Sequence, residues 1–331
     1  MDGRRWQKCV FVCSMSMLLI WLFVLGLELF RLFYQPMTLG VNSTSVVSLD
    51  KSITATSFAH TLKSQNLIKS EKSFLALVRA QGLSQKLKAG VYRVHAGETC
   101  FQFLNRVAAG DVIVESFRII EGTTQRQIAV NLAQAPYLIC QDKDWLVVSP
   151  DSAEGLLLAD TYRYNGGSQS KDLLAHAHAN LQQYLNTSWQ QRMPGLPYKT
   201  PYELLIVASI LEKEAAIPSE KRLIAGVIVN RINKHMPLQM DPTVIYGLGS
   251  AYNGKLTHDN MLIDSPYNSY RYRGLPPTPI AMVGKDAIDA AAHPQLTAYL
   301  YFVARGDGSH HFSVTYEEQK QAISRYLRRS I

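Results

Sequence analysis

Cysteine is scarce in this chain, and its spacing matches no common metal or redox motif. The sequence holds four cysteines and no C-x-x-C pair, and its scattered histidines form no H-E-x-x-H run. These absences exclude the usual zinc patterns, so we expect no metal. Cys9 and Cys13 lie in an apolar run and are expected to be packing residues. The sequence leaves open whether Cys100 and Cys140 form a disulfide.

Other chemical signatures are missing as well. There is no glycine-rich phosphate loop, no G-x-S-x-G nucleophile elbow, and no Lys/Arg-rich run interleaved with aromatic residues. We therefore expect no cofactor, no serine hydrolase of the elbow type and no nucleic-acid partner. The 34 basic residues outnumber the 26 acidic ones, and the net charge of +8 suits a surface near anionic lipid or an anionic polymer. What remains is carboxylate chemistry.

A long apolar run stands near the N-terminus. Residues 9–27 carry no charge, and the apolar character continues to Tyr34. This length is enough to span a bilayer. Arg4, Arg5 and Lys8 precede the run, so the positive-inside rule places the N-terminus in the cytoplasm. The run is too long for a typical cleaved signal and no small-x-small site follows it, which predicts an uncleaved single-pass anchor with the rest of the chain outside.

The region that follows reads as a polar tether over residues 36–50 and then a small module. A turn or cap followed by a short amphipathic helix recurs three times, beginning at Thr54, Gly97 and Gly122. Strand-like segments over 90–94 and 112–120 flank the second copy. This outline is typical of a small wall-binding module. Stacked helical turns without any ligand are an equally good interpretation of these residues alone.

Residues 151–331 mix helices and strands without βαβ alternation, which predicts an α+β domain. The predicted elements are helices over 173–184, 201–216, 220–233 and 316–329, a short helix from Asp241, a proline-rigid loop over 274–280 and a buried strand over 299–304. Thr200 is the expected N-cap of the second helix, with Pro201 at its first position and Glu203 completing a capping box. Ser219 and Asp241 are the expected caps of the next two.

The sequence Glu212-Lys213-Glu214 lies in the apolar part of the helix over 201–216. Side chains three and four positions apart share a helix face, so Glu214 lies under Val207, Ile210 and Leu211. A carboxylate among apolar groups is costly to ionise, and the raised pKa that results is what a general acid needs. Glu212 points roughly 200° away and is expected to support the site or to pair with a nearby cation. The alternative is that both are ordinary solvated glutamates.

Glycosidases ordinarily use two carboxylates. The candidates for a second one are Glu212, Asp241 and Asp160, although Asp241 is better explained as a helix cap and Glu212 points away from Glu214. A lone acid fits a different reaction, in which the 6-hydroxyl of a muramic acid unit attacks its own C1 and leaves a 1,6-anhydro end. One group then serves as acid to the leaving oxygen and as base to the attacking hydroxyl.

Long motifs at this point resemble one known family. They are ASILEKEAA from Ala208, NR at 230–231, LQMDPTVIYG at 238–247, YNGKL at 252–256, SPYNSYRYRGLPPTPIA at 265–281, AAAHP at 290–294 and YLYFVARGDGSHHF at 299–312. They resemble the endolytic murein transglycosylases, the YceG-like or MltG family, over essentially the whole chain. The resemblance implies residues 1–35 as cytoplasmic tip and anchor, 36–150 as tether and LysM-like module, and 151–331 as the catalytic domain.

The resemblance implies an enzyme of the bacterial inner membrane that cuts nascent peptidoglycan strands internally and limits their length alongside penicillin-binding proteins. Its catalytic glutamate matches Glu214. The sequence departs from the family at Leu156–Ala159, where the family has an aromatic residue and a proline, and at Ser313, where it has an asparagine. We therefore expect a cleft wall that differs from the family's, and we assign Ser313 no polar role.

Further substrate-binding candidates share the matched motifs and have polar or aromatic side chains. They are Glu212, Asn230, Arg231, Gln239, Asp241, Thr243, Tyr246, Tyr267, Asn268 and His310. Each has a structural role as its alternative, and Arg231 could hold Glu212 or meet a carboxylate of the substrate. Two other functions stay open: a hydrolytic muramidase with a second carboxylate, and a wall-binding scaffold without activity.

Overall fold

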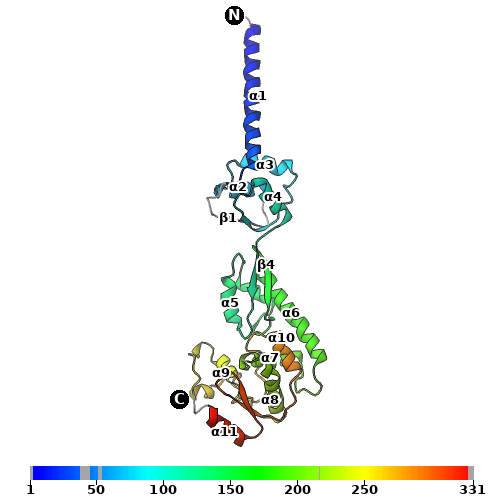
Figure 1. Ribbon diagram of the computed structural model, residues 1–331, viewed down its shortest axis with the longest axis vertical. Helices are drawn as coiled ribbons and strands as arrows, with labels where there is room; N and C mark the ends of the chain where they lie inside the picture. Colours follow the sequence, from blue (N-terminus) through cyan, green and yellow to red (C-terminus); the bar gives the residue numbers. More distant parts are fainter. Residues whose placement is uncertain (1–2, 38–44, 51–53, 216, 327–331) are drawn as a thin grey trace. The chain divides into compact units, whose positions relative to one another are not determined.

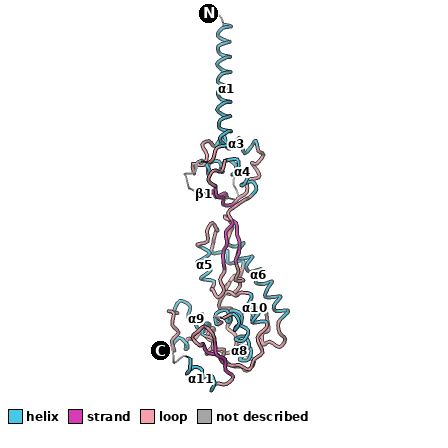
Figure 2. Tube along the Cα trace, in the orientation of Figure 1, coloured by secondary structure: helices cyan, strands magenta, loops and turns pink. Residues whose placement is uncertain are grey.

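The computed structural model describes residues 3–37, 45–50, 54–215 and 217–326. The chain forms two compact units that are discontinuous in sequence (Figures 1 and 2). Unit 1 comprises residues 1–115, 136–139 and 163–168, and unit 2 comprises residues 116–135, 140–162 and 169–331. These units are defined by contacts alone, so the three functional domains expected from the sequence stay a prediction.

Helix α1 (Gly3–Tyr34) carries the apolar run. Its stretch Val10–Tyr34 is long and apolar enough to cross a membrane, and a signal sequence would meet the same criterion. Large side chains such as Phe11 and Trp21 are exposed along it. The side chains of Arg4 and Lys8 lie outside the described part of the structure. The helix therefore fits a single-pass anchor, while its orientation stays a prediction.

Unit 1 is built on strand β1 (Ser45–Leu49), which pairs antiparallel with β2 (Gly90–Val94). The helices α2 (Ala55–Ser64), α3 (Glu71–Ala80) and α4 (Cys100–Ala109) supply the rest of its core. The tether expected over residues 36–50 is wrong for its second half, because Val47 and Leu49 are buried strand residues. The sequence suggested a tether because this strand also contains serines.

The last turn of α1 packs against the other elements of unit 1. Leu32 is buried there, and the Phe33 ring stacks on Phe101 with 4.7 Å between centroids. The backbone N–H of Met37 then donates to the Glu98 carbonyl oxygen at 2.8 Å. The end of α1 is therefore part of the hydrophobic core of unit 1.

The three predicted repeats are confirmed as capped helices. Thr54, Thr99 and Thr124 each accept a backbone N–H three residues ahead, and the side chains at those positions bond back to the caps. The third repeat is α5 (Gln125–Ala133), which lies in unit 2. Helix α3, capped by Ser70, was not predicted.

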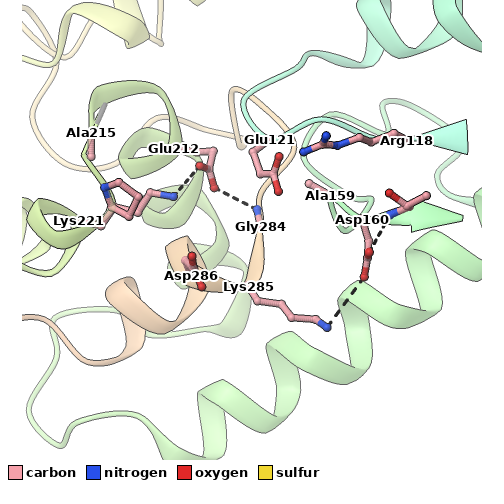
Figure 3. A pocket seen from close by; sticks show the side chains of 12 residues that line it. Arg118, Glu121, Ala159, Asp160, Glu212, Ala215, Lys221, Gly284, Lys285 and Asp286 are labelled. Atoms are coloured by element: carbon pink, nitrogen blue, oxygen red, sulfur yellow. Dashed lines mark hydrogen bonds and ion pairs between the residues drawn. The ribbon is translucent and has the colours of Figure 1, made fainter. Parts of the chain in front are cut away.

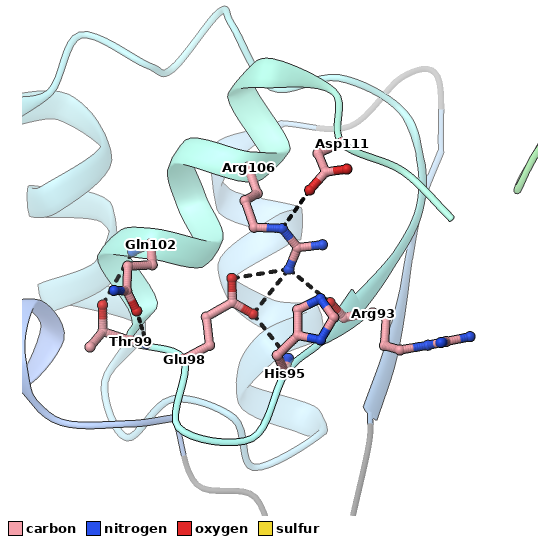
Figure 4. Close-up of polar contacts among 7 residues, drawn as sticks. All are labelled: Arg93, His95, Glu98, Thr99, Gln102, Arg106 and Asp111. Carbon is pink, nitrogen blue, oxygen red and sulfur yellow. Dashed lines mark hydrogen bonds and ion pairs between the residues drawn. The ribbon is translucent and has the colours of Figure 1, made fainter. Parts of the chain in front are cut away.

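A partly buried ion pair fixes the turn before α4 (Figure 4). The Arg106 Nη1 atom lies 3.0 Å from Oε1 of Glu98, whose side chain is only 6% exposed, and Arg106 Nε donates to Asp111 at 2.8 Å. Glu98 also accepts the backbone N–H of His95 at 3.0 Å. Because the buried Glu98 carboxylate has a cationic partner, it avoids the large cost of an isolated buried charge.

Cys100 and Cys140 form no disulfide within the described part of the chain. Cys100 is buried in unit 1, and this burial raises the pKa of its thiol to about 12. The Cys140 thiol donates to the Leu132 carbonyl oxygen at 3.2 Å. The sequence left open whether these two cysteines form a disulfide, and the structure shows that they do not.

Unit 2 mixes helices and short strands, as the α+β prediction required. Its helices are α5, α6 (Ser170–Gln191), α7 (Pro201–Glu214), α8 (Lys221–Asn233), α9 (Asp241–Leu248), α10 (Lys285–Ala292) and α11 (Tyr316–Tyr326). Strand β5 (Tyr301–Ala304) pairs antiparallel with β6 (His310–Ser313) in this unit. Strand β3 (Val114–Arg118) pairs with β4 (Thr161–Asn165), and each of these two strands has residues in both units. Helix α7 is central, since α6, α8, α9 and α10 all contact it.

Several predicted boundaries are corrected by the structure. Helix α6 is longer than residues 173–184 at both ends, and β5 is shorter than predicted, with only Val303 buried. Ser219 caps no helix: residues Pro218–Glu220 form a single 3-10 turn, and α8 begins at Lys221 without a side-chain cap. Residues 327–329 of the predicted terminal helix lie outside the described part of the chain.

Candidate active site

Helix α7 delivers the two glutamates to different surroundings. Thr200 caps it by accepting the Glu203 backbone N–H at 3.2 Å, but the Glu203 carboxylate bonds back to the Lys199 N–H rather than to the cap. The predicted capping box is therefore replaced by a bond one residue earlier. Every residue from Leu204 to Leu211 is at most 3% exposed. The helix ends at Glu214 because Ala215 has an extended backbone, and Pro218 follows.

Glu214 lies at the C-terminal end of this buried helix and is itself partly buried. Burial raises the pKa of its carboxyl group to about 8, and the negative charge of Asp241 adds to the rise. Desolvation is the larger cause, because a charged carboxylate loses its hydration among apolar groups. At neutral pH the group therefore keeps its proton, as the helix-face argument predicted.

Asp241 is not the helix cap that we favoured from the sequence. Met240 occupies the cap position of α9 without a side-chain bond, and Asp241 is the first residue inside the helix. Its carboxylate instead accepts the Tyr270 hydroxyl at 2.5 Å. The cap interpretation failed because an Asp before Pro fits either position. Asp241 is therefore a second carboxylate at this site, and its negative charge raises the pKa of Glu214.

Tyr270 is a site residue that sequence reasoning missed. Its pKa is raised by burial first, and then by the hydrogen bond and charge of Asp241 and by the charge of Glu214. Asn268 holds it in place by accepting the Tyr270 N–H at 3.0 Å and donating to the Met261 and Ile263 carbonyl oxygens. The available signal was its place two residues after Asn268, within a motif already matched.

Glu212 faces a different wall of unit 2 (Figure 3). One carboxylate oxygen lies 2.7 Å from Nζ of Lys221, and the other accepts the Gly284 N–H at 3.0 Å. Glu212 thus ties α7 to α8 and to the N-terminus of α10. Of the two roles expected for it, pairing with a cation is the one observed. Asp160 lies on the same side, 4.0 Å from Lys285.

Arg231 does not hold Glu212. It is buried, and its guanidinium donates to the carbonyl oxygens of Leu300, Pro237 and Leu238 and to the side chain of Gln239. Gln239 is exposed and has a left-handed backbone with φ of 51°. Such conformations cost energy in residues other than glycine and concentrate at functional sites. Arg231 therefore braces the strained residue two positions before Asp241.

Other candidates have their polar groups occupied by the protein. Asn230 donates to the Thr297 and Tyr299 carbonyl oxygens, and Thr243 is fully buried, with its hydroxyl bonded to the Met240 carbonyl oxygen. His310 lies 2.7 Å from Glu220, which also accepts the His310 backbone N–H. Their contribution to substrate binding stays a prediction.

Two tyrosines of the matched motifs have their rings in contact, tilted at 60°, near a carboxylate that sequence reasoning missed. Tyr246 and Tyr267 have ring centroids 4.7 Å apart, and Tyr246 donates its hydroxyl to Glu154 at 3.3 Å. Burial raises the pKa of Glu154, and this carboxylate also accepts the Gln125 N–H at 3.0 Å. Its only signal in the sequence was an acidic residue two positions before the apolar run that begins at Leu156.

Known proteins share this architecture. The YceG-like family model matches residues 47–325. A Bacillus subtilis protein named endolytic murein transglycosylase is 30% identical over 88% of this chain and 88% of its own length. A Streptococcus pneumoniae protein of the same name is 28% identical over 73% of this chain and 51% of its own length. A crystal structure of a YceG-like protein from Listeria monocytogenes matches 85% of this chain and 100% of its own, with a TM-score of 0.52 and 26% identity. The chain therefore belongs to the YceG-like family.

Proposed function

We propose that this protein is an endolytic murein transglycosylase that cuts glycan strands with Glu214 as its single acid and base. The observation that carries the proposal is the Glu214 carboxyl group, whose pKa burial raises to about 8 at the end of an apolar helix. A general acid must be protonated at the working pH and near enough to it in pKa to release the proton. Family membership and the names of the relatives support the same reaction.

The reaction begins with a proton transfer from Glu214 to the glycosidic oxygen between muramic acid C1 and the next sugar. The bond between C1 and that oxygen breaks, and the leaving sugar departs with a free hydroxyl. The 6-hydroxyl of the same muramic acid unit then bonds to C1, and its proton passes to the Glu214 carboxylate. Glu214 is thereby restored, no water is consumed, and the product ends in a 1,6-anhydro ring.

Asp241 and Tyr270 are proposed to stabilise the positive charge that develops at C1. Asp241 is the acidic group whose charge acts on Glu214, and the Tyr270 hydroxyl fixes its carboxylate at 2.5 Å. A fixed negative charge near a developing cation lowers the barrier without reorganisation during the reaction. Gln239, exposed and strained beside Asp241, is proposed to contact the sugar.

A hydrolytic muramidase is the second candidate. It is favoured by Asp241, which does not cap α9 and whose charge acts on Glu214. With two carboxylates in one site, Asp241 could activate water or attack C1 while Glu214 donates the proton. The products separate the two reactions. Hydrolysis leaves a reducing muramic acid end. The transglycosylase leaves the anhydro end, which is lighter than the reducing end by the mass of one water molecule.

We further propose that α1 is an uncleaved anchor in the bacterial inner membrane with its N-terminus in the cytoplasm. The charge asymmetry of Arg4, Arg5 and Lys8 supports this orientation. The order strand, helix, helix, strand of unit 1 supports a LysM-like module within residues 36–150, beside a catalytic domain over 151–331. Penicillin-binding proteins that make the strands are the proposed partners.

The proposal is tested by digesting isolated peptidoglycan with the detergent-solubilised full chain and reading the fragments by mass spectrometry. Anhydro-ended fragments from the interior of strands are the expected result. Reducing ends would replace the proposal by hydrolysis with Asp241. No fragments, with binding to peptidoglycan retained, would leave a scaffold.

A further inference from the structure

A polar cavity of about 570 Å³ lies within unit 2 on the side of α7 that Glu212 faces (Figure 3). Four chain segments other than α7 form its wall. The lining residues are Arg118, Glu121, Ala159, Asp160, Thr161, Glu212, Ala215, Pro218, Lys221, Gly284, Lys285 and Asp286. Glu214, only two residues from Glu212, is absent from this lining. The cavity is therefore distinct from the Glu214 site and shares its helix.

The floor of the cavity is a built and buried ion pair. The side chains of Glu212 and Lys221 are 6% and 9% exposed, with 2.7 Å between the charged atoms. The Gly284 N–H satisfies the second carboxylate oxygen of Glu212. A pair this well bonded keeps both charges in place, so the floor is rigid before any ligand arrives.

The charges around this floor are not all used by the protein. Among the described residues, Arg118, Glu121 and Asp286 line the cavity without an ion-pair partner within 4.0 Å. Glu121 lies close to Glu212, since a Cβ atom added to Gly284 would stand 3.6 Å from a carboxylate oxygen of each. One free cation and two free carboxylates suit a ligand that brings both an anionic group and a cationic group.

A second hollow of about 320 Å³ shares Asp160 and Lys285 with the first. Its lining adds the side-chain amides of Asn180 and Gln183 and the hydroxyl of Thr187. Amide and hydroxyl groups both donate and accept hydrogen bonds, as peptide groups require. The two hollows together suit an elongated polar chain better than a compact ion.

We propose that this cavity binds the peptide branch that murein carries on its muramic acid units. The inference rests on the proposed function. These branches are short chains with carboxylates, amide bonds and, on a diamino acid, a free amine. Arg118 receives a branch carboxylate, and Glu121 with Asp286 receives the amine. Glu212 and Glu214 point to different sides of α7, but Ala215, directly after Glu214, lines the cavity. A branch that runs around the end of the helix can therefore be seated here while its muramic acid unit is at Glu214.

The test compares two substrates. One is glycan strands with their peptide branches, and the other is the same strands after an amidase has removed them. The wild-type chain is expected to have a several-fold higher kcat/KM on branched strands. Arg118→Ala and Glu121→Gln are expected to reduce the ratio of the two rates by three- to tenfold, the worth of one charge contact of about 1 kcal/mol. Arg222→Ala removes an exposed arginine outside the cavity and should leave the ratio unchanged.

A binding measurement supplies a second readout that needs no turnover. The probe is the tripeptide L-alanyl-γ-D-glutamyl-meso-diaminopimelate, titrated into the full chain by calorimetry. Saturable binding that weakens in Arg118→Ala and Glu121→Gln supports the proposal. Equal rates on both substrates, an unchanged ratio in both variants or no tripeptide binding would overturn it. If anhydro ends appear from neither substrate, the proposed function itself has failed and the inference falls with it.

Discussion

Tyr270 donates its hydroxyl to the Asp241 carboxylate at 2.5 Å, and this bond joins two distant parts of the chain at the site of Glu214. It fixes a negative charge where that charge opposes the ionisation of Glu214. Burial on α7 and the charge on α9 therefore act in the same direction, and both keep Glu214 protonated at neutral pH. The Asp241 carboxylate bonds to Tyr270 and does not cap α9.

Asp241→Asn is expected to move the alkaline limb of the pH–rate profile to lower pH. The substitution removes the charge that adds to the raised pKa of Glu214, while the larger effect of burial remains. The limb should therefore shift only part of the way back toward the ordinary range of a glutamate. Tyr270→Phe keeps the charge of Asp241 and serves as the matched control. A limb in Asp241→Asn that coincides with that of wild type would show that Asp241 does not act on the acid.

Glu214→Gln is expected to stabilise the protein, and the gain should depend on pH. The folded pKa of about 8 lies above the usual value of 4.5, so the unfolded state loses its proton first as pH rises. Below pH 4.5 both states are protonated and the carboxyl group carries no ionisation penalty. Between pH 4.5 and 8 the wild type loses stability relative to the amide, and above pH 8 the difference is constant at about 5 kcal/mol. Urea unfolding at pH 4, 6 and 9 measures it, and a gain that is the same at all three would contradict the raised pKa.

Lys221→Met is expected to lower the free energy of unfolding by about 3 kcal/mol. The substitution leaves the Glu212 carboxylate, 6% exposed, without its cation, and breaking a buried pair costs far more than removing both partners. The double variant Glu212→Gln with Lys221→Met should therefore lose less than the single variant. Thermal unfolding of the wild type, of the single variants Glu212→Gln and Lys221→Met and of the double variant gives the coupling free energy between the two side chains. Independent, additive losses would show that the pair contributes little.

Gly155→Ala is expected to be the more damaging of two matched glycine substitutions. Gly155 and Gly195 have similar positive φ angles of 72° and 80°, so each alanine has a backbone cost of about 1 kcal/mol. At Gly155 the added Cβ also meets the Pro279 Cβ at 2.3 Å, whereas nothing lies within 4 Å at Gly195. The crowding should add about 1–3 kcal/mol. Equal melting temperatures for the two variants would mean that the segment around Pro279 moves to make room for the added methyl group.

Local rules predicted well where one residue decides the structure. Thr54, Thr99, Thr124 and Thr200 were found as caps because the cap, the turn and the helix that follows are neighbours in sequence. The separate faces of Glu212 and Glu214 followed from helix geometry in the same way. Ser219 failed as a cap because Pro218 opens a 3-10 turn that a serine signal cannot reveal.

Long-range relationships could not be predicted from local pattern. The partner of Asp241 is a tyrosine 29 positions later, and the partner of Tyr246 is a glutamate 92 positions earlier. The strand β1 was read as a tether because its pairing with β2 is what buries Val47. Only the tertiary fold decides which polar residues near α7 are occupied by the protein and which are left for a substrate.

The identity of the acid is tested most directly by one comparison. Wild-type protein and Glu214→Gln, both in detergent and both checked for folding by circular dichroism, digest the same glycan strands, and anhydro ends are counted by mass spectrometry. The account predicts anhydro ends from the wild type and a loss of at least about 10²-fold in the variant, as the removal of a general acid requires. A folded Glu214→Gln protein that cuts at the wild-type rate would contradict it.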